Sequence, residues 1–132
     1  MVNVVSAYIE IDNKFLIAQR KSGKFKGLWE FPGGKVEIGE TDEMAIEREI
    51  KEELEIDVKA HEFMASNIHY LPNKTIFLKL YRCEYITGQI KLNDHLDYRF
   101  IDKSEINNFE FCPGDIPIIN EIIDTRIKKR TK

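Results

Sequence analysis

Two apolar runs open the chain, and a short polar pair separates them. Residues 2–11 (VNVVSAYIEI) and 14–20 (KFLIAQR) are rich in apolar and β-branched side chains, and Asp12-Asn13 lies between them. Apolar runs on either side of a two-residue polar turn predict a β-hairpin.

A glycine- and proline-punctuated stretch and then a helical pattern follow. Residues 23–34 predict a loop that contains one short strand at residues 29–31. Thr41 is a suitable N-cap, and the two acids after it suit the positive end of a helix. Apolar side chains then recur every four residues, at Ile46, Ile50 and Leu54. This spacing predicts a helix over residues 42–54 with one buried stripe.

The second half of the chain alternates strands with one more helix. Its predicted elements are two long paired strands at residues 56–70 and 75–86 joined by residues 71–74, a strand after the turn at Thr87-Gly88, a strand at residues 97–102, and a helix at residues 116–127. The last helix is predicted from apolar residues at helical spacing, which are Ile119, Ile122, Ile123 and Ile127. Strands before, between and after two helices predict an α+β protein, an α/β/α sandwich with a mixed sheet flanked by helices.

Composition and charge narrow the class of protein. A chain of 132 residues, 42% hydrophobic and 33% charged, suits a single globular domain over residues 1–132. The net charge of −3 gives no electrostatic case for a stable nucleic-acid partner, and we expect the basic end (126–132) to be a frayed, solvated terminus. Two cysteines, no signal-peptide pattern and no long apolar run lead us to expect a cytoplasmic protein without a membrane segment.

Three carboxylates crowd one strip of the predicted helix. Glu49, Glu52 and Glu53 lie three and four positions apart, where like charges cost roughly 0.2–0.5 kcal/mol per pair. They lie beside the buried stripe rather than on the solvent face, and Arg48 alone does not balance three anions. Carboxylate oxygens are the ligands that Mg²⁺ takes, usually together with water and substrate phosphates. The strip therefore indicates a divalent metal site, although a glutamate-rich surface helix is the simpler interpretation of any one residue.

Glycines just before the helix fit the same chemistry. Gly33 and Gly34 allow the main chain to approach a metal or a phosphate closely. Lys35 adds a positive charge for a phosphate oxygen.

The motif from residue 34 to residue 56 resembles the Nudix box. All charged positions of that pattern are filled, by Glu40, Arg48, Glu49, Glu52 and Glu53. One position departs from it, because Glu55 replaces a late glycine near the helix end, where positive φ is common. We expect this glutamate to cost about 1 kcal/mol of backbone strain or to shift the helix end.

The resemblance implies hydrolysis of a nucleoside diphosphate linked to another group, with Mg²⁺ or Mn²⁺ as cofactor. By this likeness Glu49 and Glu53 are the principal metal ligands, Glu52 binds directly or through water, and Gly33 lends its carbonyl. Arg48 orients the glutamates from outside the metal shell. A silent Nudix domain that only senses a nucleotide, and an RNA-end processing enzyme, are the alternatives. We expect a monomer or a homodimer.

Within the family, the chain is most similar to the MutT-type nucleoside triphosphate pyrophosphohydrolases. Arg20 and Lys74 match positions that contact substrate there, although each could be a solvated charge. Asp94 lies six residues before Phe100, at the place of a further loop acid with a role in catalysis, and Asp97 is a substitute candidate. His95 in the same loop could assist, but as a lone loop histidine it is expected to be merely exposed.

Base recognition is implied at one position just before the last helix. Asp115 matches the base-reading residue of the MutT type, and it is also a suitable N-cap for a helix that begins at Ile116. Phe31 could stack on a base or belong to the core. A carboxylate accepts hydrogen bonds and donates only when protonated, so Asp115 does not separate guanine from cytosine. The first expected substrate is 8-oxo-dGTP, and CTP or a modified dCTP is the second.

Overall fold

The computed structural model describes the main chain of residues 1–130 and the side chains of residues 1–123. In chain order its elements are β1 (Val2–Ile11), β2 (Lys14–Arg20), β3 (Trp29–Glu30), β4 (Gly33–Lys35), α1 (Asp42–Leu54), β5 (Asp57–Tyr70), β6 (Thr75–Thr87), β7 (His95–Ile101), the 3₁₀ helix η1 (Lys103–Asn108) and α2 (Ile116–Arg130). The prediction for the side chain of Ile127 and that for the basic end lie outside the described side chains.

One mixed seven-stranded sheet organises the chain. Its strand order is β3-β2-β1-β6-β5, with β4 paired to β1 and β7 paired to β2. The central pair β1–β6 is parallel, and the hairpins β1–β2 and β5–β6 are antiparallel. Since β1 lies in the middle and carries β4 on one edge, the glycines of β4 are held against it.

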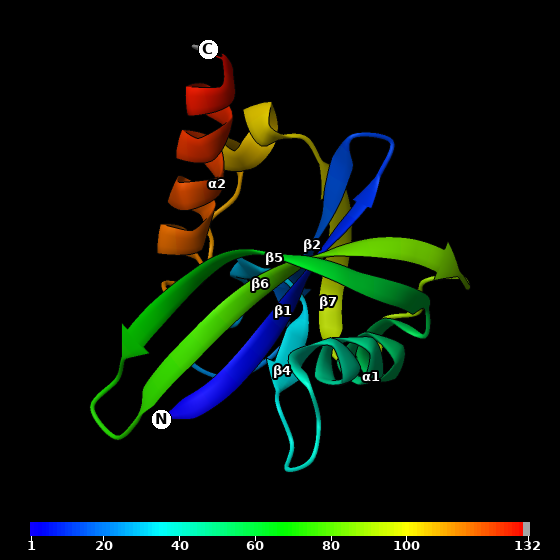
Figure 1. Ribbon diagram of the computed structural model, residues 1–132, viewed down its shortest axis with the longest axis vertical. Helices are drawn as coiled ribbons and strands as arrows, with labels where there is room; N and C mark the ends of the chain where they lie inside the picture. Colours follow the sequence, from blue (N-terminus) through cyan, green and yellow to red (C-terminus); the bar gives the residue numbers. More distant parts are fainter. Residues whose placement is uncertain (131–132) are drawn as a thin grey trace.

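Alternation along β1 divides the interior into two cores. Val5, Ala7 and Ile9 pack with the apolar stripe of α1, while Tyr8 between them packs in the core that α2 covers. The two helices lie on opposite sides of the strands (Figure 1). The predicted α/β/α sandwich with a mixed sheet is therefore confirmed.

The local predictions in the first half of the chain hold closely. The turn between β1 and β2 has positive φ at Asp12 (52°) and Asn13 (65°), as a two-residue hairpin with right-handed strand twist requires. Helix α1 has the predicted bounds, and Thr41 caps it by accepting a hydrogen bond from the main-chain N–H of Met44 at 3.1 Å. Its stripe Ile46, Ile50 and Leu54 is fully buried.

The predicted strand after Gly88 is wrong. Residues 89–94 instead run past the end of α1, where the main-chain N–H of Lys91 donates to the carbonyl of Leu54 (2.9 Å) and that of Asn93 donates to the carbonyl of Glu53 (3.0 Å). The last carbonyls of a helix need such partners. The two short elements β4 and η1 were not predicted.

Helix α2 covers the second core with its first turns. Ile118, Ile119 and Ile122 are buried there, and the predicted helix is confirmed with a longer C-terminal end. Among the described residues, no helix combines the length and the apolar character that a membrane span needs.

Candidate active site

Arg48 lies at the centre of a charge network on α1. Its Nε and Nη2 donate to both oxygens of Glu40 at 2.7 and 2.9 Å, and Nη1 donates to Glu49 at 3.0 Å and to Glu52 at 3.4 Å. Nη2 also donates to the carbonyl of Lys35 at 3.1 Å. The hydrogen bonds from Arg48 lower the pKa of Glu40 to about 2. One guanidinium thus fixes the helix to the β4 segment and orients Glu49 at the same time.

Glu49 and Glu53 form a close pair of carboxyl groups. Glu53 is 7% exposed, and its burial, followed by the hydrogen bond and charge of Glu49, raises its pKa to about 10. The Glu49 carboxylate fills the space beside Gly34, where an added Cβ would lie 2.4 Å from the Glu49 Cδ. An alanine at position 34 would therefore displace this carboxylate.

Glu52 lies apart from that pair. Its side chain is 60% exposed and lies on the solvent side of Arg48. Its carbonyl, in contrast, is held, because the Asn93 side-chain amide donates to it at 2.9 Å. The structure brings two of the three predicted carboxylate ligands together and keeps the third at the surface.

The donor set fits a hard divalent cation. Two carboxyl groups in contact, with one buried, repel each other when both are ionised, and a divalent ion removes this repulsion. Gly33 lies directly against β1, where an added Cβ would approach the carbonyl of Val5 to 2.0 Å, so this backbone contact also requires glycine. Lys35 is exposed on β4, and its carbonyl is engaged by Arg48.

A cavity of about 260 Å³ opens beside the carboxyl pair. The predicted site residues that line it are Arg20, Phe31, Gly33, Gly34, Glu53, Asp94 and Asp115. Phe31 is also a core residue, 4% exposed, with ring centroids 5.8 Å from Phe15 and 6.1 Å from Tyr8. Lys74, in the exposed β5–β6 turn, is not among the described residues that line the cavity.

Glu30, which the sequence did not single out, joins several of these groups. Its Oε1 lies 3.1 Å from Nη1 of Arg20, and its Oε2 lies 2.9 Å from Nε2 of His95. The expectation that His95 is exposed is wrong, because the residue is 6% exposed. Strand pairing explains both positions, since β3 and β7 flank β2 on its two edges and His95 pairs with Arg20.

Asp94 and Asp97 have different surroundings. Asp94 borders the cavity, and its charge contributes to the raised pKa values of Arg20 and Glu53. Asp97 is engaged on its own strand, where it accepts a hydrogen bond from the main-chain N–H of Tyr98 (2.8 Å) and pairs with Arg99 (2.6 Å). The geometry therefore favours Asp94 as the loop acid of the site.

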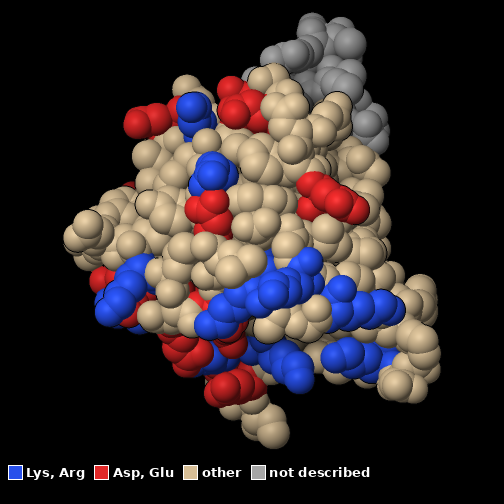
Figure 2. All heavy atoms as spheres, turned by 180° about the vertical axis from the view of Figure 1, so that it is seen from behind, with Lys and Arg blue, Asp and Glu red and all other residues tan. Residues whose placement is uncertain are grey.

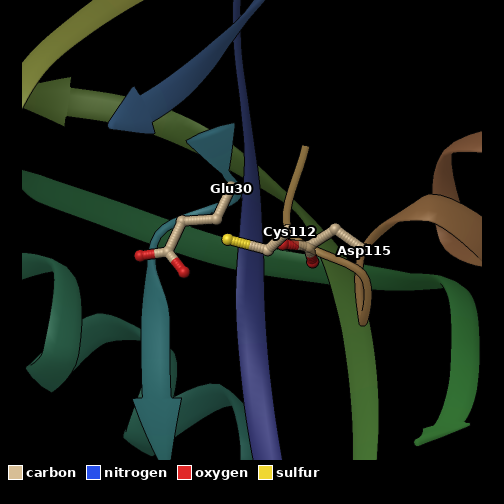
Figure 3. Close-up of side chains that lie close together, drawn as sticks. All are labelled: Glu30, Cys112 and Asp115. Atoms are coloured by element: carbon tan, nitrogen blue, oxygen red, sulfur yellow. The ribbon is translucent and has the colours of Figure 1, made fainter. Parts of the chain in front are cut away.

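Glu30, Cys112 and Asp115 converge at the inner end of the cavity. Their ligand atoms all lie within 4.8 Å of one another, with Glu30 on β3 and the other two on the segment that leads into α2 (Figure 3). A thiol is a poor ligand for Mg²⁺, so this trio does not fit the hard cation that suits the Glu49–Glu53 pair. Burial and the charges of Glu30 and Asp115 raise the pKa of Cys112 to about 12.

Asp115 is a buried acid in this trio. It is 5% exposed, and burial, followed by the charge of Glu30, raises its pKa well above the usual range against the opposing effects of Arg20 and the main-chain N–H of Phe31. It directly precedes α2, and its main-chain carbonyl accepts the first helical hydrogen bond, from Ile119 at 2.9 Å. Burial and the charge of Glu30 therefore favour the neutral form of this carboxyl group, which borders the cavity.

The surface carries both signs of charge in neighbouring patches. Seen from behind, Lys and Arg side chains gather in a band across the lower half of the molecule, and acidic side chains border this band (Figure 2). The connection between β2 and β3 contributes three exposed lysines, Lys21, Lys24 and Lys26. Positive side chains next to an acidic site suit a polyphosphate that arrives with a cation.

Known proteins are similar to this chain in sequence and in fold. The NUDIX domain family matches residues 2–122, and the chain belongs to this family. It is 34% identical over 127 residues to the CTP pyrophosphohydrolase of Escherichia coli K12, covering 96% of this chain and 94% of that protein. It is 29% identical over 112 residues to the 8-oxo-dGTP diphosphatase of the same organism, covering 84% and 87%.

Solved structures also match this chain in fold. The solution structure of the E. coli ORF135 protein aligns with a TM-score of 0.84 and 33% identity, over 96% of this chain and 91% of that one. The MutT protein from Methanosarcina mazei Go1, at 24% identity and a TM-score of 0.79 over 99% and 95%, has the same fold. The predicted family and fold are thus confirmed, and the chain is a Nudix hydrolase.

Proposed function

We propose that the protein is a Mg²⁺- or Mn²⁺-dependent nucleoside triphosphate pyrophosphohydrolase. Water adds to a phosphorus atom of the substrate, the bond between the α and β phosphates breaks, and the products are a nucleoside monophosphate and pyrophosphate. The observation that carries this proposal is the contact between the carboxyl groups of Glu49 and Glu53 at the edge of a cavity with Arg20 and Asp115. Such a cavity offers a cation site, a phosphate contact and a base contact in one place.

The roles of the side chains follow from their contacts. Glu49 and Glu53 would hold the divalent ion, which supplies charge neutralisation for the polyphosphate and activation of water. Arg48 keeps Glu49 in place through its hydrogen bond. Arg20 presents a half-exposed guanidinium to phosphate oxygens, and Asp94, next to the cavity, is the candidate to accept the proton of the attacking water.

The raised pKa of Asp115, which favours its neutral form, narrows the choice of base. A neutral carboxyl group donates one hydrogen bond and accepts another side by side. Cytosine matches this pair with its ring N3 and its amino group, and 8-oxoguanine matches it with O6 and the N7–H. Unmodified guanine presents two acceptors at O6 and N7, where a neutral acid matches it poorly, but its O6 and N1–H form the same acceptor–donor pair as in 8-oxoguanine. We therefore propose 8-oxo-dGTP or a cytosine nucleotide as substrate, and we propose a preference over dGTP for a base that turns its O6/N7 edge toward Asp115.

The relatives support both substrates without deciding between them. The names CTP pyrophosphohydrolase and 8-oxo-dGTP diphosphatase belong to proteins that match most of this chain. The decisive experiment measures pyrophosphate release with Mg²⁺ from 8-oxo-dGTP, dGTP, CTP, dCTP, ATP and UTP. Turnover of sugar nucleotides or dinucleoside polyphosphates alone would contradict the triphosphate assignment, and nucleotide affinity without turnover would support a sensor instead.

Two variants test the role of Asp115. Asp115→Asn also offers a donor beside an acceptor, so we expect it to keep the preferred base. Asp115→Leu offers neither, and we expect a loss of about 1–3 kcal/mol in discrimination, or roughly 10–100-fold in the ratio of kcat/KM values against dGTP. An unchanged ratio in the leucine variant would assign Asp115 only to the start of α2.

A further inference from the structure

His95 is buried between two acids, although a lone loop histidine is usually exposed. Its side chain is 2% exposed, with Nε2 2.9 Å from Glu30 Oε2 and Nδ1 3.9 Å from Glu53 Oε1. Glu30 in turn is paired with Arg20. The imidazole ring thus lies in a row of four groups that runs from the phosphate contact to the metal-binding carboxyl pair.

Nδ1 of His95 has no hydrogen-bond partner in the described part of the chain. The other buried side-chain polar atoms in the same situation are Ser6 Oγ and Arg20 Nε, and both residues line the cavity. Buried polar atoms are nearly always paired, so each exception calls for an explanation such as a catalytic role or a bound water or ion. A histidine that only fills the core would not aim a bare nitrogen at an acid of the site.

The backbone around His95 is held at two points by hydrogen-bonded neighbours. His95 is the first residue of β7 and pairs with Arg20 of β2. Two positions earlier, Asn93 is bound to the end of α1 through its main-chain N–H, which donates to the carbonyl of Glu53. The residue that carries the imidazole is therefore tied to the last turn of the helix that carries Glu53.

We infer that His95 is a positioning residue that holds the Glu53 carboxyl group through Nδ1 and the Glu30–Arg20 pair through Nε2. This role rests on the proposed function, because it assigns Glu53 to the metal. Closing the 3.9 Å gap between Nδ1 and Glu53 Oε1 would align Glu53 for the cation, whereas the 2.9 Å contact of Nε2 with Glu30 keeps Arg20 in place for the phosphates. Groups that support metal ligands in this way change metal affinity or activity by about 10–100-fold when removed.

Two substitutions separate the two contacts. The amide of asparagine can replace Nδ1 of a histidine, and the longer glutamine can replace Nε2. We expect His95→Asn to keep Mn²⁺ affinity and kcat while KM rises. We expect His95→Gln to keep KM while the Mn²⁺ dissociation constant of the nucleotide-free protein, measured by electron paramagnetic resonance, rises roughly tenfold and kcat falls.

His95→Leu removes both contacts and should show both effects. His61 supplies the matched control, because its Nε2 also lies 3.0 Å from a glutamate (Glu84) but at the exposed β5–β6 surface. We expect His61→Asn and His61→Gln to bind Mn²⁺ like the wild type. Circular dichroism melts of all variants show whether the fold is kept.

The outcomes distinguish this role from the proposed function. Equal behaviour of the asparagine and glutamine variants at position 95, in a wild type that binds Mn²⁺ and turns over nucleotide, would overturn the positioning role alone. The reversed pattern, with asparagine losing Mn²⁺ affinity, would overturn it as well. Absence of Mn²⁺ binding and turnover in the wild type would overturn the proposed function and this role together.

Discussion

Replacing Glu53 by glutamine should stabilise the metal-free protein while it removes most of the activity. In the folded chain Glu53 is buried beside Glu49, which raises its pKa from about 4.5 to about 10. The unfolded chain releases this proton near pH 4.5, but the folded chain keeps it. Stability is therefore lost as the pH rises above 4.5, and the loss continues until the folded group ionises.

The size of the effect follows from the pH interval. Each pH unit between 4.5 and 8 costs up to about 1.4 kcal/mol, so the upper limit at pH 8 is about 5 kcal/mol. We expect about 1–3 kcal/mol of this in practice, or roughly 3–12 °C in Tm for a chain of this size. Glutamine has no charge to desolvate and avoids this cost.

Thermal melts in EDTA at pH 5 and pH 8 measure this difference in stability between Glu53→Gln and the wild type. We expect Glu53→Gln to melt above the wild type at pH 8 and close to it at pH 5. Glu43→Gln is the matched control, because Glu43 is exposed in the first turn of the same helix and favours it, so its loss should lower Tm slightly. Mg²⁺ should raise the Tm of the wild type and not that of Glu53→Gln. A glutamine variant that is less stable than the wild type at pH 8 without metal would refute this reasoning.

Two further predictions concern backbone contacts of the site. Gly34→Ala should fold but lose roughly 100-fold in kcat/KM, because its Cβ displaces the Glu49 carboxylate. Gly33→Ala should fail to give stable protein, because its Cβ meets the carbonyl of Val5 at 2.0 Å. Soluble yield and activity assays compare the two variants. A stable Gly33→Ala protein would contradict this difference. Asn93→Ala should lose about 1–2 kcal/mol in urea unfolding, because two side-chain hydrogen bonds of 2.9 Å to the end of α1 are lost, and an unchanged midpoint would exclude this anchoring role.

The parts of the fold that were predicted correctly are encoded in short stretches of the sequence. The stripe of α1, its Thr41 cap and the Asp12-Asn13 turn are encoded within a few residues, and all three were predicted correctly. The strand expected after Gly88 was a wrong prediction, because the N–H groups of Lys91 and Asn93 donate to carbonyls of a helix some forty residues earlier. No local pattern reports such a contact.

The candidate site was predictable only where its members share one element. Glu49, Glu53 and Arg48 lie on one helix, so their spacing and the Nudix resemblance were sufficient to single them out. Glu30 and His95 meet through the pairing of β3 and β7 with β2, which the sequence does not specify. The raised pKa of Asp115 likewise depends on its burial and on Glu30, 85 positions away along the chain.

Glu55 takes the left-handed conformation that its family position reserves for glycine, with φ 58°, and its carboxylate accepts a hydrogen bond from Asn93. The strained C-terminal end of α1 is thus hydrogen-bonded to residues 89–94, the segment that leads to Asp94 and His95. A glycine at position 55 would relax the backbone, but it would also remove the hydrogen bond that the Glu55 carboxylate accepts from Asn93. We therefore expect positions 55 and 93 to change together among sequences descended from this one, because a change at either position alone loses the hydrogen bond between them.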